Sequence, residues 1–412
     1  ESIPLFEIDW NESDIQSVTD SITRGGYWAK GPYVDELEQR LEQYLNIDHA
    51  LVVNSGTTAL TAALRGSGVG EGDEVIVPSF TFIATANAVR LTGAEPVFAD
   101  IETQTYGLSP SDVESKITDA TAAILPVHCY GTSCRIQELT QIAEDHGVLL
   151  IEDAAEVLGA EYQGKKLGTF GDAAALSFCQ NKITPTGEGG AVVTDDEEIA
   201  KQVKLYRSHG RASEDYFESS GSGEYVAVGT NIRMSDMTAA LGCSQLDRID
   251  TLIERRQSVA STYAEYLSDV DNVTPHQTLQ GATHVYQLYT VELDTDVSRQ
   301  NIIQTLENNN IASKVYWDPP AHLTNYYSEY MSDIPKLPKT RDIAGRVLSL
   351  PMHPGLSEES IRRVTSTIDE AVISVRMFYP HLPSYLFTVF SISVLIFSFI
   401  FSPLSPTLCS VT

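Results

Sequence analysis

Three segments of the chain contain polar residues whose types and order suit chemistry. The first is "NSGTT", residues 54–58, where a predicted strand turns through Gly56 into a predicted helix. Hydroxyl and backbone N–H groups therefore gather at a helix N-terminus, which is an anion site. A simple helix cap explains the same residues, so this segment alone leaves both interpretations open.

The second segment is "VLLIEDAAEVLGAEY", an apolar strand that ends in Asp153. A carboxylate at the end of a buried strand needs a cationic partner, because an unpaired buried charge is costly. A protonated pyridine nitrogen would satisfy this requirement. The structural alternative is that Asp153 caps a helix that follows it.

The third segment is "SFCQNKITPTGEGGAVVTDD", in which Ser177 lies five residues before Lys182 and a glycine-rich turn follows. A lysine is usually a solvated surface charge, and the glycines explain a hairpin equally well. Together, however, an anion site, a buried acid and a lysine are what pyridoxal 5'-phosphate requires. They would supply a phosphate cradle, a partner for the ring nitrogen and an amine that binds the cofactor.

The elements that must position these residues follow from an alternation of patterns. From about residue 35 to 240, amphipathic stretches such as "DELEQRLEQYL" alternate with short β-rich runs such as "DEVIVPS". This alternation predicts an α/β fold with a mainly parallel sheet covered by helices on both faces. Active sites in such folds lie at the carboxyl ends of the strands.

The domain organisation that we predict has three parts. Residues 1–245 form a large domain with an N-terminal segment, and residues 246–372 form a smaller α+β domain that contains "HVYQLYTVEL" as a strand. Residues 373–412 form a hydrophobic tail, in which residues 385–401 are an uncharged apolar run. At about 1.5 Å per residue, this run is slightly shorter than the hydrocarbon core of a bilayer. A marginal C-terminal membrane anchor and an appended extension are the two interpretations of the tail.

The composition favours a small-molecule partner. The 412 residues include 56 acidic and 27 basic side chains, a net charge of −29, which disfavours binding to nucleic acid. Because the acid is spread along the chain, we expect a salt-loving source, with an ordinary acidic protein as the alternative. The five cysteines lack metal-binding spacing, so we expect reduced thiols and no metal site. We find no signal peptide and expect a cytoplasmic protein.

The segments "IEDAAEVLGAEY", "SFCQNKITPTGEGGAVVTDD" and "GTNIRMSDMTAALG" resemble motifs of the sugar-nucleotide aminotransferases, a branch of the fold type I pyridoxal-phosphate enzymes. The similarity runs from "IPLFEIDW" to "STIDEAV", about nine-tenths of the chain. The "NK…TGEGG" and "DAAE" variants are most similar to those of GDP-perosamine synthases. The resemblance implies a fold type I large domain followed by a smaller C-terminal domain.

The resemblance also implies a role for each matching position. Lys182 would hold pyridoxal 5'-phosphate covalently and then carry the proton, and Asp153 would keep the pyridine nitrogen protonated. Phe82, in "SFTFIAT", would stack on the cofactor ring, with a core aromatic as the alternative. The cofactor phosphate would be held by Ser55, Gly56, Thr57 and Ser177. Asn231 would reach the phosphate of the neighbouring subunit, which predicts a homodimer.

Four further residues complete the predicted site. Glu156 occupies the position after "DAA" and would touch the cofactor or the sugar. His128 would shape the floor of the pocket, and His284 and His322 would line the sugar site. For each histidine a structural role is the alternative.

The activity that the resemblance implies is transfer of an amino group from L-glutamate to a nucleoside-diphosphate 4-keto-6-deoxy sugar, for glycan or surface polysaccharide biosynthesis. A 3-keto sugar aminotransferase of the same family is one alternative. A non-catalytic cofactor-binding protein is another, which the presence of both Lys182 and Asp153 disfavours. Relatives that dehydrate a sugar at position 3 carry histidine in place of the lysine, so Lys182 disfavours that reaction.

Overall fold

The computed structural model describes residues 2–213 and 223–378. The predicted tail lies outside the described residues from position 379 onward, so its two interpretations stay predictions. Residues 373–378 belong to the helix α13 (Glu358–Phe378), which runs past the boundary predicted at residue 372. Within the described ranges, no helix is both long enough and apolar enough to cross a membrane.

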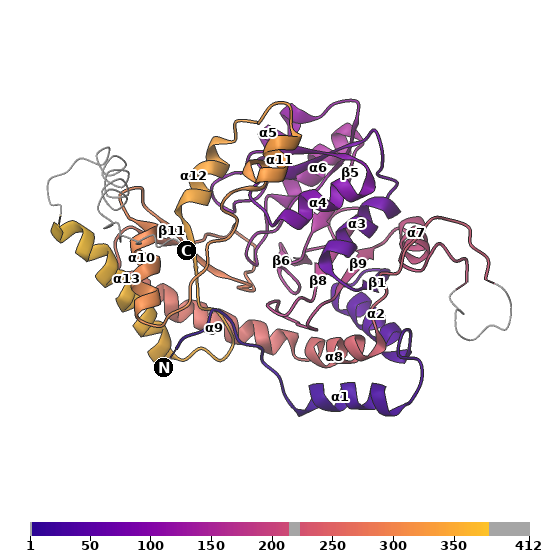
Figure 1. Cartoon of the computed structure of the whole chain (residues 1–412), viewed down its shortest axis with the longest axis horizontal. Helices are drawn as coiled ribbons and strands as arrows, with labels where there is room; N and C mark the ends of the chain where they lie inside the picture. The colour runs from indigo at the N-terminus through magenta and orange to yellow at the C-terminus, as the bar shows by residue number, and fades with distance from the viewer. Residues whose placement is uncertain (1, 214–222, 379–412) are drawn as a thin grey trace, which may run out of the picture.

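The first part of the chain alternates helices and strands, as the sequence predicts (Figure 1). Its helices are α1 (Glu12–Thr23), α2 (Pro32–Leu45), α3 (Gly56–Gly66), α4 (Ile83–Thr92), α5 (Pro110–Lys116), α6 (Ile136–His146), α7 (Glu197–Arg207) and α8 (Asp236–Leu246). Its strands are β1 (His49–Val53), β2 (Glu74–Pro78), β3 (Glu95–Ala99), β4 (Thr121–Ile124), β5 (Leu149–Asp153), β6 (Glu161–Tyr162), β7 (Lys165–Lys166), β8 (Ala173–Ser177) and β9 (Gly190–Thr194). Local signals set helix ends: the Ser55 side chain caps α3, and Gly147, with a φ of +66°, ends α6.

In the described part of the chain, the central sheet has seven strands in the order β1-β9-β8-β5-β4-β2-β3. The pairs β2–β3, β2–β4, β4–β5 and β5–β8 are parallel, whereas β9 runs antiparallel to both of its neighbours. The sheet is therefore mainly parallel, and the predicted fold class is confirmed. Because β8 and β9 form a hairpin, the glycine-rich turn after Lys182 is part of the loop that joins them.

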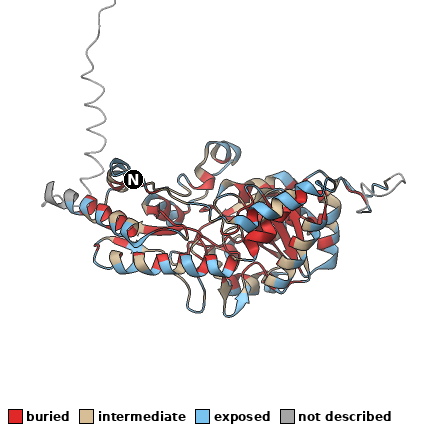
Figure 2. Cartoon of the chain, turned by 90° about the horizontal axis from the view of Figure 1, so that it is seen from below, coloured by how far each residue is buried: buried red, intermediate tan, exposed pale blue. Residues whose placement is uncertain are grey.

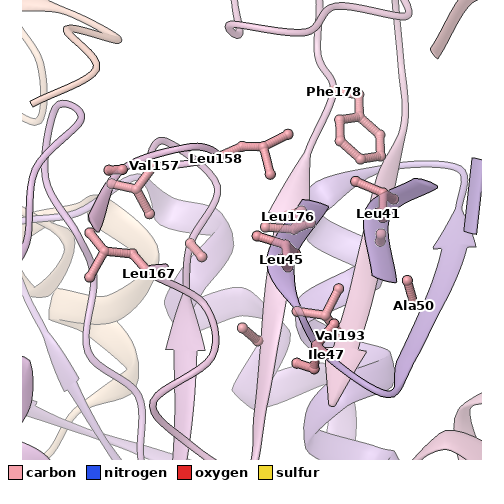
Figure 3. Close-up of a cluster of buried hydrophobic side chains, with 14 of the residues drawn as sticks. Leu41, Leu45, Ile47, Ala50, Val157, Leu158, Leu167, Leu176, Phe178 and Val193 are labelled. Carbon is pink, nitrogen blue, oxygen red and sulfur yellow. The ribbon is translucent and has the colours of Figure 1, made fainter. Parts of the chain in front are cut away.

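Helices cover both faces of this sheet because its strands are apolar on both sides. In β1, Ala50 and Val52 point into a buried cluster that includes side chains of α2 and α6. Leu51 and Val53 point into a second cluster, with side chains of α3, α4 and α7. Since successive strand residues point to opposite faces, two clusters are what a covered parallel sheet requires. Figure 2 shows the buried strands between half-exposed helices, and Figure 3 shows part of the first cluster.

The edge strand β1 is protected by charged side chains of its neighbours. On α2, Glu38 accepts the N–H of Val52 at 2.9 Å. Glu42, one turn later, accepts the N–H of Ala50 at 3.1 Å. Arg207, at the end of α7, donates to the carbonyl oxygen of Val52 at 3.1 Å and also to Glu38. An exposed strand edge invites pairing with other chains, so these contacts keep the sheet from extending.

The C-terminal part contains α9 (Ile249–Leu267), β10 (Val273–Pro275), β11 (Tyr289–Leu293), α10 (Arg299–Asn308), the short 3-10 helix η1 (Ala321–Leu323), α11 (Asn325–Tyr330), α12 (Pro338–Arg346), β12 (Val347–Leu350) and α13. Its strands form an antiparallel sheet in the order β10-β11-β12, which shares a separate core with α9, α10 and α13. The segment from 321 to 337 instead places Ala321, Tyr327 and Leu337 in the core of the large sheet. The predicted boundary after residue 245 falls at the end of α8 and stays a prediction.

One predicted strand is shorter than expected. "HVYQLYTVEL" spans residues 284–293, but β11 begins only at Tyr289. The side chain of His284 accepts the N–H of Tyr286 at 2.8 Å, and Tyr286 has a positive φ of 50°, so the backbone turns before the strand begins. A local side-chain hydrogen bond therefore overrides the apolar pattern.

Candidate active site

The carboxyl ends of β5 and β8 bring the predicted acid and the predicted lysine to the same edge of the sheet. Asp153 is the last residue of β5, and Lys182 follows the end of β8 in the loop to β9. The two strands pair directly, with Asp153 opposite Ala175. This is the edge at which α/β folds place their active sites.

The loop that carries Lys182 is fixed by its own backbone. The Lys182 N–H donates to the carbonyl oxygen of Cys179 at 2.8 Å, and the Gln180 N–H donates to that of Gly187 at 2.9 Å. Gly187 has a φ of +87°, which glycine adopts without strain. Phe178 anchors the start of the loop in the hydrophobic core, as Figure 3 shows. Lys182 is therefore held by a closed turn rather than by an open surface loop.

The Lys182 side chain contacts a single carboxylate among the described residues. Its Nζ lies 3.1 Å from Oε1 of Glu156, and the two side chains are only 14% and 13% exposed. The other carboxylate oxygen of Glu156, Oε2, accepts the N–H of Tyr130 at 2.8 Å. Because both oxygens are engaged, the carboxylate fixes the position of the lysine Nζ. Glu156, which we expected near the cofactor or the sugar, lies within hydrogen-bond distance of the lysine.

Asp153 is a buried acid that makes no ion pair among the described residues. Its Oδ2 accepts the hydroxyl of Thr85 at 2.8 Å, and its Oδ1 accepts the N–H of Ala155 at 3.2 Å. Burial raises the pKa of the Asp153 carboxyl, and the hydrogen bond from Thr85 opposes this shift. Residues 154–160 form turns and no helix, so the alternative that Asp153 is a helix cap is wrong.

The N-terminus of α3 meets the end of β8. Ser55 caps the helix, because its Oγ accepts the N–H of Thr58 at 3.2 Å. A Cβ added at Gly56 would lie 2.8 Å from the Cβ of Ser177, so the two segments approach too closely for a larger residue. Within the described residues, the N–H groups of Gly56 and Thr57 have no hydrogen-bond acceptor. Capping therefore uses only part of this terminus, and the remaining N–H groups can bind an anion.

Two predicted site residues are exposed within this single chain. Phe82 precedes α4 and is 61% exposed. Asn231 is also exposed, and its Oδ1 accepts the N–H of Arg233 at 3.4 Å. The exposure of Phe82 makes the alternative of a core aromatic wrong. The contact of Asn231 with a neighbouring subunit stays a prediction.

His128 belongs to a buried structural network. Its Nε2 lies 2.9 Å from the Glu152 carboxylate, and its Nδ1 accepts the N–H of Cys134 at 3.2 Å. Glu152 also accepts the N–H groups of Gly168, Phe170 and Gly171. Because both ring nitrogens are engaged in the interior, the structural alternative describes His128 better than a contact with substrate.

The other two predicted histidines are also buried. The His284 ring stacks on Tyr286 with centroids 3.9 Å apart, and burial lowers the pKa of His284 well below its usual value. His322 bonds through Nδ1 to the hydroxyl of Ser79, and burial lowers the pKa of His322 to about 4. Both rings are therefore neutral near pH 7 and have structural contacts. Their predicted role in lining a sugar site stays a prediction.

Sequence analysis missed two residues that complete the site. Thr85 binds Asp153 from α4, and Tyr130 binds Glu156 through its backbone. Thr85 lies three residues after Phe82, so the helical spacing of "TFIATAN" could have placed both on one face. Tyr130 has a positive φ of 62°, and no sequence signal marks a bulky residue in that conformation.

These groups fit pyridoxal 5'-phosphate. A partly buried amine at Lys182 suits its aldehyde, and a buried acid without an ion pair at Asp153 suits its basic ring nitrogen. The N-terminus of α3 suits its phosphate. Among the described residues, no cluster of side chains has the arrangement of a metal site.

Comparisons with known proteins identify a family to which the chain is similar. A family model described as the DegT/DnrJ/EryC1/StrS aminotransferase family matches residues 9–369. The chain is 37% identical over 376 residues to a GDP-perosamine synthase of Caulobacter vibrioides, covering 90% of this chain and 98% of that protein. It is 34% identical to a dTDP-3-amino-3,4,6-trideoxy-alpha-D-glucose transaminase of Streptomyces venezuelae, with 89% and 96% covered. The structure of a putative sugar aminotransferase from Streptococcus pneumoniae, in its PLP form, matches with a TM-score of 0.85 at 29% identity, with 91% and 100% covered.

Proposed function

The chain belongs to the DegT/DnrJ/EryC1/StrS aminotransferase family, and from this premise we propose that it transfers an amino group from L-glutamate to a nucleoside-diphosphate 4-keto-6-deoxy sugar. The proposed cofactor is pyridoxal 5'-phosphate, bound through Lys182. The amino group of glutamate would replace the keto oxygen of the sugar, leaving 2-oxoglutarate. The amino sugar nucleotide would serve glycan or surface polysaccharide biosynthesis.

The main support for this proposal is the direct pairing of β5 with β8. It brings Asp153, the last residue of β5, and Lys182, in the loop after β8, to the same edge of the sheet. The lysine amine is largely shielded from water and is held by Glu156 at 3.1 Å. The acid is buried on the adjoining strand, with a hydroxyl and one backbone N–H as its donors. A lysine with only a surface role would not need to be shielded and held by a carboxylate. An acid that only caps a helix would not need to be buried at a strand end.

Pyridoxal 5'-phosphate, when bound, supplies an electron-accepting ring next to the carbon that carries the amino group. Asp153 would hold a proton on the ring nitrogen, and Thr85 would orient the carboxylate through its hydroxyl. Ser55, Gly56, Thr57 and Ser177 would hold the phosphate, and Phe82 would cover the ring face. Lys182 Nζ would move the proton at the substrate carbon, and Glu156 would keep that nitrogen in position.

The position of the keto group on the sugar is the finer part of the proposal. The relative from Caulobacter vibrioides is a GDP-perosamine synthase, whereas the one from Streptomyces venezuelae is named for a 3-amino sugar. The identities of 37% and 34% are similar, and the higher one favours the 4-keto sugar. A 3-keto sugar is therefore the second candidate.

The proposed activity can be tested with purified protein, L-glutamate and matched pairs of 4-keto and 3-keto sugar nucleotides. We expect amino sugar nucleotide and 2-oxoglutarate in equal amounts with a 4-keto substrate, detected by mass spectrometry. Product only from 3-keto substrates would support the second candidate. No product from either class, together with no 2-oxoglutarate, would favour a non-catalytic cofactor-binding protein.

The proposed site includes Asn231 from a second subunit, and mixing variants tests this arrangement. Lys182→Ala and Asn231→Ala subunits would each be inactive alone. After subunit exchange, mixed dimers would contain one intact site, which restores about a quarter of the wild-type activity. No recovery, although light scattering shows dimers that exchange subunits, would mean that Asn231 acts within its own chain.

A further inference from the structure

The loop between β8 and β9, residues 178–189, is held by a residue of the C-terminal part of the chain, Gln287. We call this loop the Lys182 loop. The Gln287 side chain is only 2% exposed, and its Nε2 donates to the carbonyl oxygen of Asn181 at 2.6 Å. The two residues are 106 positions apart, and Asn181 directly precedes Lys182. A long-range hydrogen bond therefore reaches the backbone next to the lysine.

The backbone just before Gln287 is anchored by helix α9. Arg256, which is 4% exposed, donates to the carbonyl oxygen of Tyr286 at 2.8 Å. Gln257 donates through Nε2 to the carbonyl oxygen of His284 at 3.1 Å. Because these contacts fix the backbone on one side of Gln287, its amide is presented to Asn181 as a donor in a defined place.

The residue after Gln287 supports the carboxylate that contacts the lysine. The Leu288 N–H donates to the carbonyl oxygen of Tyr130 at 3.1 Å. The Tyr130 N–H donates to Glu156 at 2.8 Å, and the other carboxylate oxygen of Glu156 lies 3.1 Å from Lys182 Nζ. Neighbouring residues of one segment therefore contact the backbone beside Lys182 and the residue that holds Glu156.

Stability alone does not explain an amide side chain at position 287. Its Oε1 is buried and has no hydrogen-bond partner within the described part of the chain. A buried acceptor without a partner destabilises a fold by at least as much as a typical hydrogen bond stabilises it. An apolar side chain of similar volume would fill the same space without this cost. The donor to Asn181 is therefore the property that distinguishes glutamine at this position.

We propose that Gln287 is a positioning residue, which holds the backbone at Asn181 so that the Lys182 amine is correctly placed. Its kinetic consequence rests on the proposed function, in which Lys182 binds the cofactor and moves the proton. Misplacement of a reacting group by about 1 Å can slow a reaction about a hundredfold. Gln287 acts through the loop, because its buried side chain contacts Asn181 and not the Lys182 amine.

Gln287→Met is the test variant, because methionine has a similar length and volume but no N–H to donate. Gln257→Met is the matched control. It also removes an amide donor to a backbone carbonyl of the same segment, but Gln257 makes no hydrogen bond to the Lys182 loop among the described residues.

Amide hydrogen exchange in the full chain measures the Lys182 loop without cofactor or substrate. The Gln180 and Lys182 N–H groups donate within this loop at 2.9 Å and 2.8 Å. We expect both to exchange about fivefold faster or more in Gln287→Met than in the wild type, because the loop loses a hydrogen bond that holds it closed. Gln257→Met should exchange like the wild type.

A single turnover with excess L-glutamate measures the effect on chemistry. In cofactor-loaded Gln287→Met, 2-oxoglutarate release at saturating glutamate should slow about tenfold or more. The glutamate concentration that gives half of the maximal rate should change little. Denaturant unfolding should show stability close to that of the wild type, because the lost hydrogen bond is offset by removal of the unpaired Oε1. A purely structural residue would show lower stability and an unchanged rate per cofactor-loaded chain.

Three outcomes would overturn the proposal. One is that Gln287→Met has the exchange and the turnover rate of the wild type. Another is that Gln257→Met slows the turnover as much as Gln287→Met, which would leave the donor to Asn181 without a special role. The third is that Gln287→Met loses stability but keeps the wild-type rate per loaded chain. If the wild type itself released no 2-oxoglutarate, the proposed function would be wrong, and the exchange difference would still decide whether Gln287 positions the loop.

Discussion

At the scale of single residues, Glu152 and Asp153 are adjacent buried acids with different hydrogen-bond donors. Asp153 has two donors, the Thr85 hydroxyl and the Ala155 N–H, whereas Glu152 accepts hydrogen bonds from the His128 ring and three backbone N–H groups. Successive strand residues point to opposite faces, so one acid supports the fold while the other faces the candidate site. Because the two acids have different roles, we expect different effects when each is replaced by the corresponding amide.

Asp153→Asn should fold normally and lose most activity. An amide keeps the size of the side chain and can still accept the Thr85 hydrogen bond, but it cannot hold a proton on a pyridine nitrogen by its charge. We expect kcat to fall by about a hundredfold or more, with little change in the melting temperature. Steady-state kinetics and calorimetry measure the two effects. Near-wild-type turnover in a variant that binds cofactor would contradict the role of Asp153.

Glu152→Gln should instead destabilise the protein. The amide replaces one acceptor oxygen with an NH2 donor, so either the Gly168 N–H or the N–H groups of Phe170 and Gly171 lose their acceptor, and the free energy of unfolding should fall by about 3 kcal/mol. Denaturant unfolding measures this difference. Glu71→Gln is the matched control, because Glu71 is exposed. Equal stability of the two variants would contradict the assigned structural role.

The stabilisation by Glu152 should depend on pH. Burial alone would raise the pKa of Glu152, but the hydrogen bonds from His128 and from the N–H groups of Gly171 and Gly168 lower it. Because the folded-state pKa is lowered, this stabilisation is complete above the usual carboxyl pKa of about 4.3 and is lost as pH falls through the folded value. The difference in unfolding free energy between wild type and Glu152→Gln should therefore shrink on acidification below that value.

Sequence analysis predicted roles for Lys182 and Asp153 because each lies at or just after the end of an apolar strand. A charged side chain in such a place indicates a functional site in an α/β fold. Helical spacing could place Thr85 on the same face as Phe82, but it could not predict the hydrogen bond of Thr85 to Asp153, since a contact between residues 68 positions apart depends on the order of the strands. Nor could sequence analysis assign Glu152 and His128 to the interior. Glu152 directly precedes Asp153, and which acid faces inward depends on the register of β5 against its neighbours.

At the scale of elements, the candidate site depends on the close approach of α3 and β8. Gly56→Ala should weaken both packing and cofactor binding, because the new methyl group would lie 2.8 Å from the Cβ of Ser177. We expect a loss of about 1–3 kcal/mol in stability. Gly345→Ala is the matched control, since its added Cβ would meet no atom within 4 Å.

Thermal unfolding and cofactor retention on dialysis would measure both effects of the glycine substitutions. Gly345→Ala lies within α12 and should be neutral or slightly stabilising. If Gly56→Ala matched the control in both measurements, the close approach would not be needed for the phosphate site.

The helices and parallel strands were predictable from periodicity and from signals at their ends, whereas the order of the strands in the sheet was not. "GTTALTAALRGSG" and "IQELTQIAEDHG" predict α3 and α6, because a cap or a glycine marks an end of each. The glycine-rich loop is consistent with the antiparallel hairpin of β8 and β9, but nothing local predicts that β9 also pairs with β1. Because β1 is distant in sequence, only the folded sheet determines this second pairing.

At the scale of the whole molecule, the net charge of −29 predicts that salt stabilises the fold. Repulsion between surface carboxylates should weaken the protein at low ionic strength, and screening should relieve it. The melting temperature should therefore rise by several degrees between dilute and molar NaCl. Sucrose at equal osmolality is the control, because it favours compact states without screening charge. A melting temperature that rises equally in both solutes would contradict the electrostatic explanation.

The most direct test of the whole account is a single turnover with one substrate. Cofactor-loaded protein is mixed with excess L-glutamate and no sugar, and 2-oxoglutarate is measured per chain. We predict about one equivalent from the wild type, none from Lys182→Ala and little from Lys182→Arg, because the proton must move through the Lys182 amine. The amount of cofactor bound is measured in each variant, so loss of chemistry is separated from loss of binding. If cofactor-loaded Lys182→Ala released as much 2-oxoglutarate at the same rate as the wild type, the central role of Lys182 would be wrong.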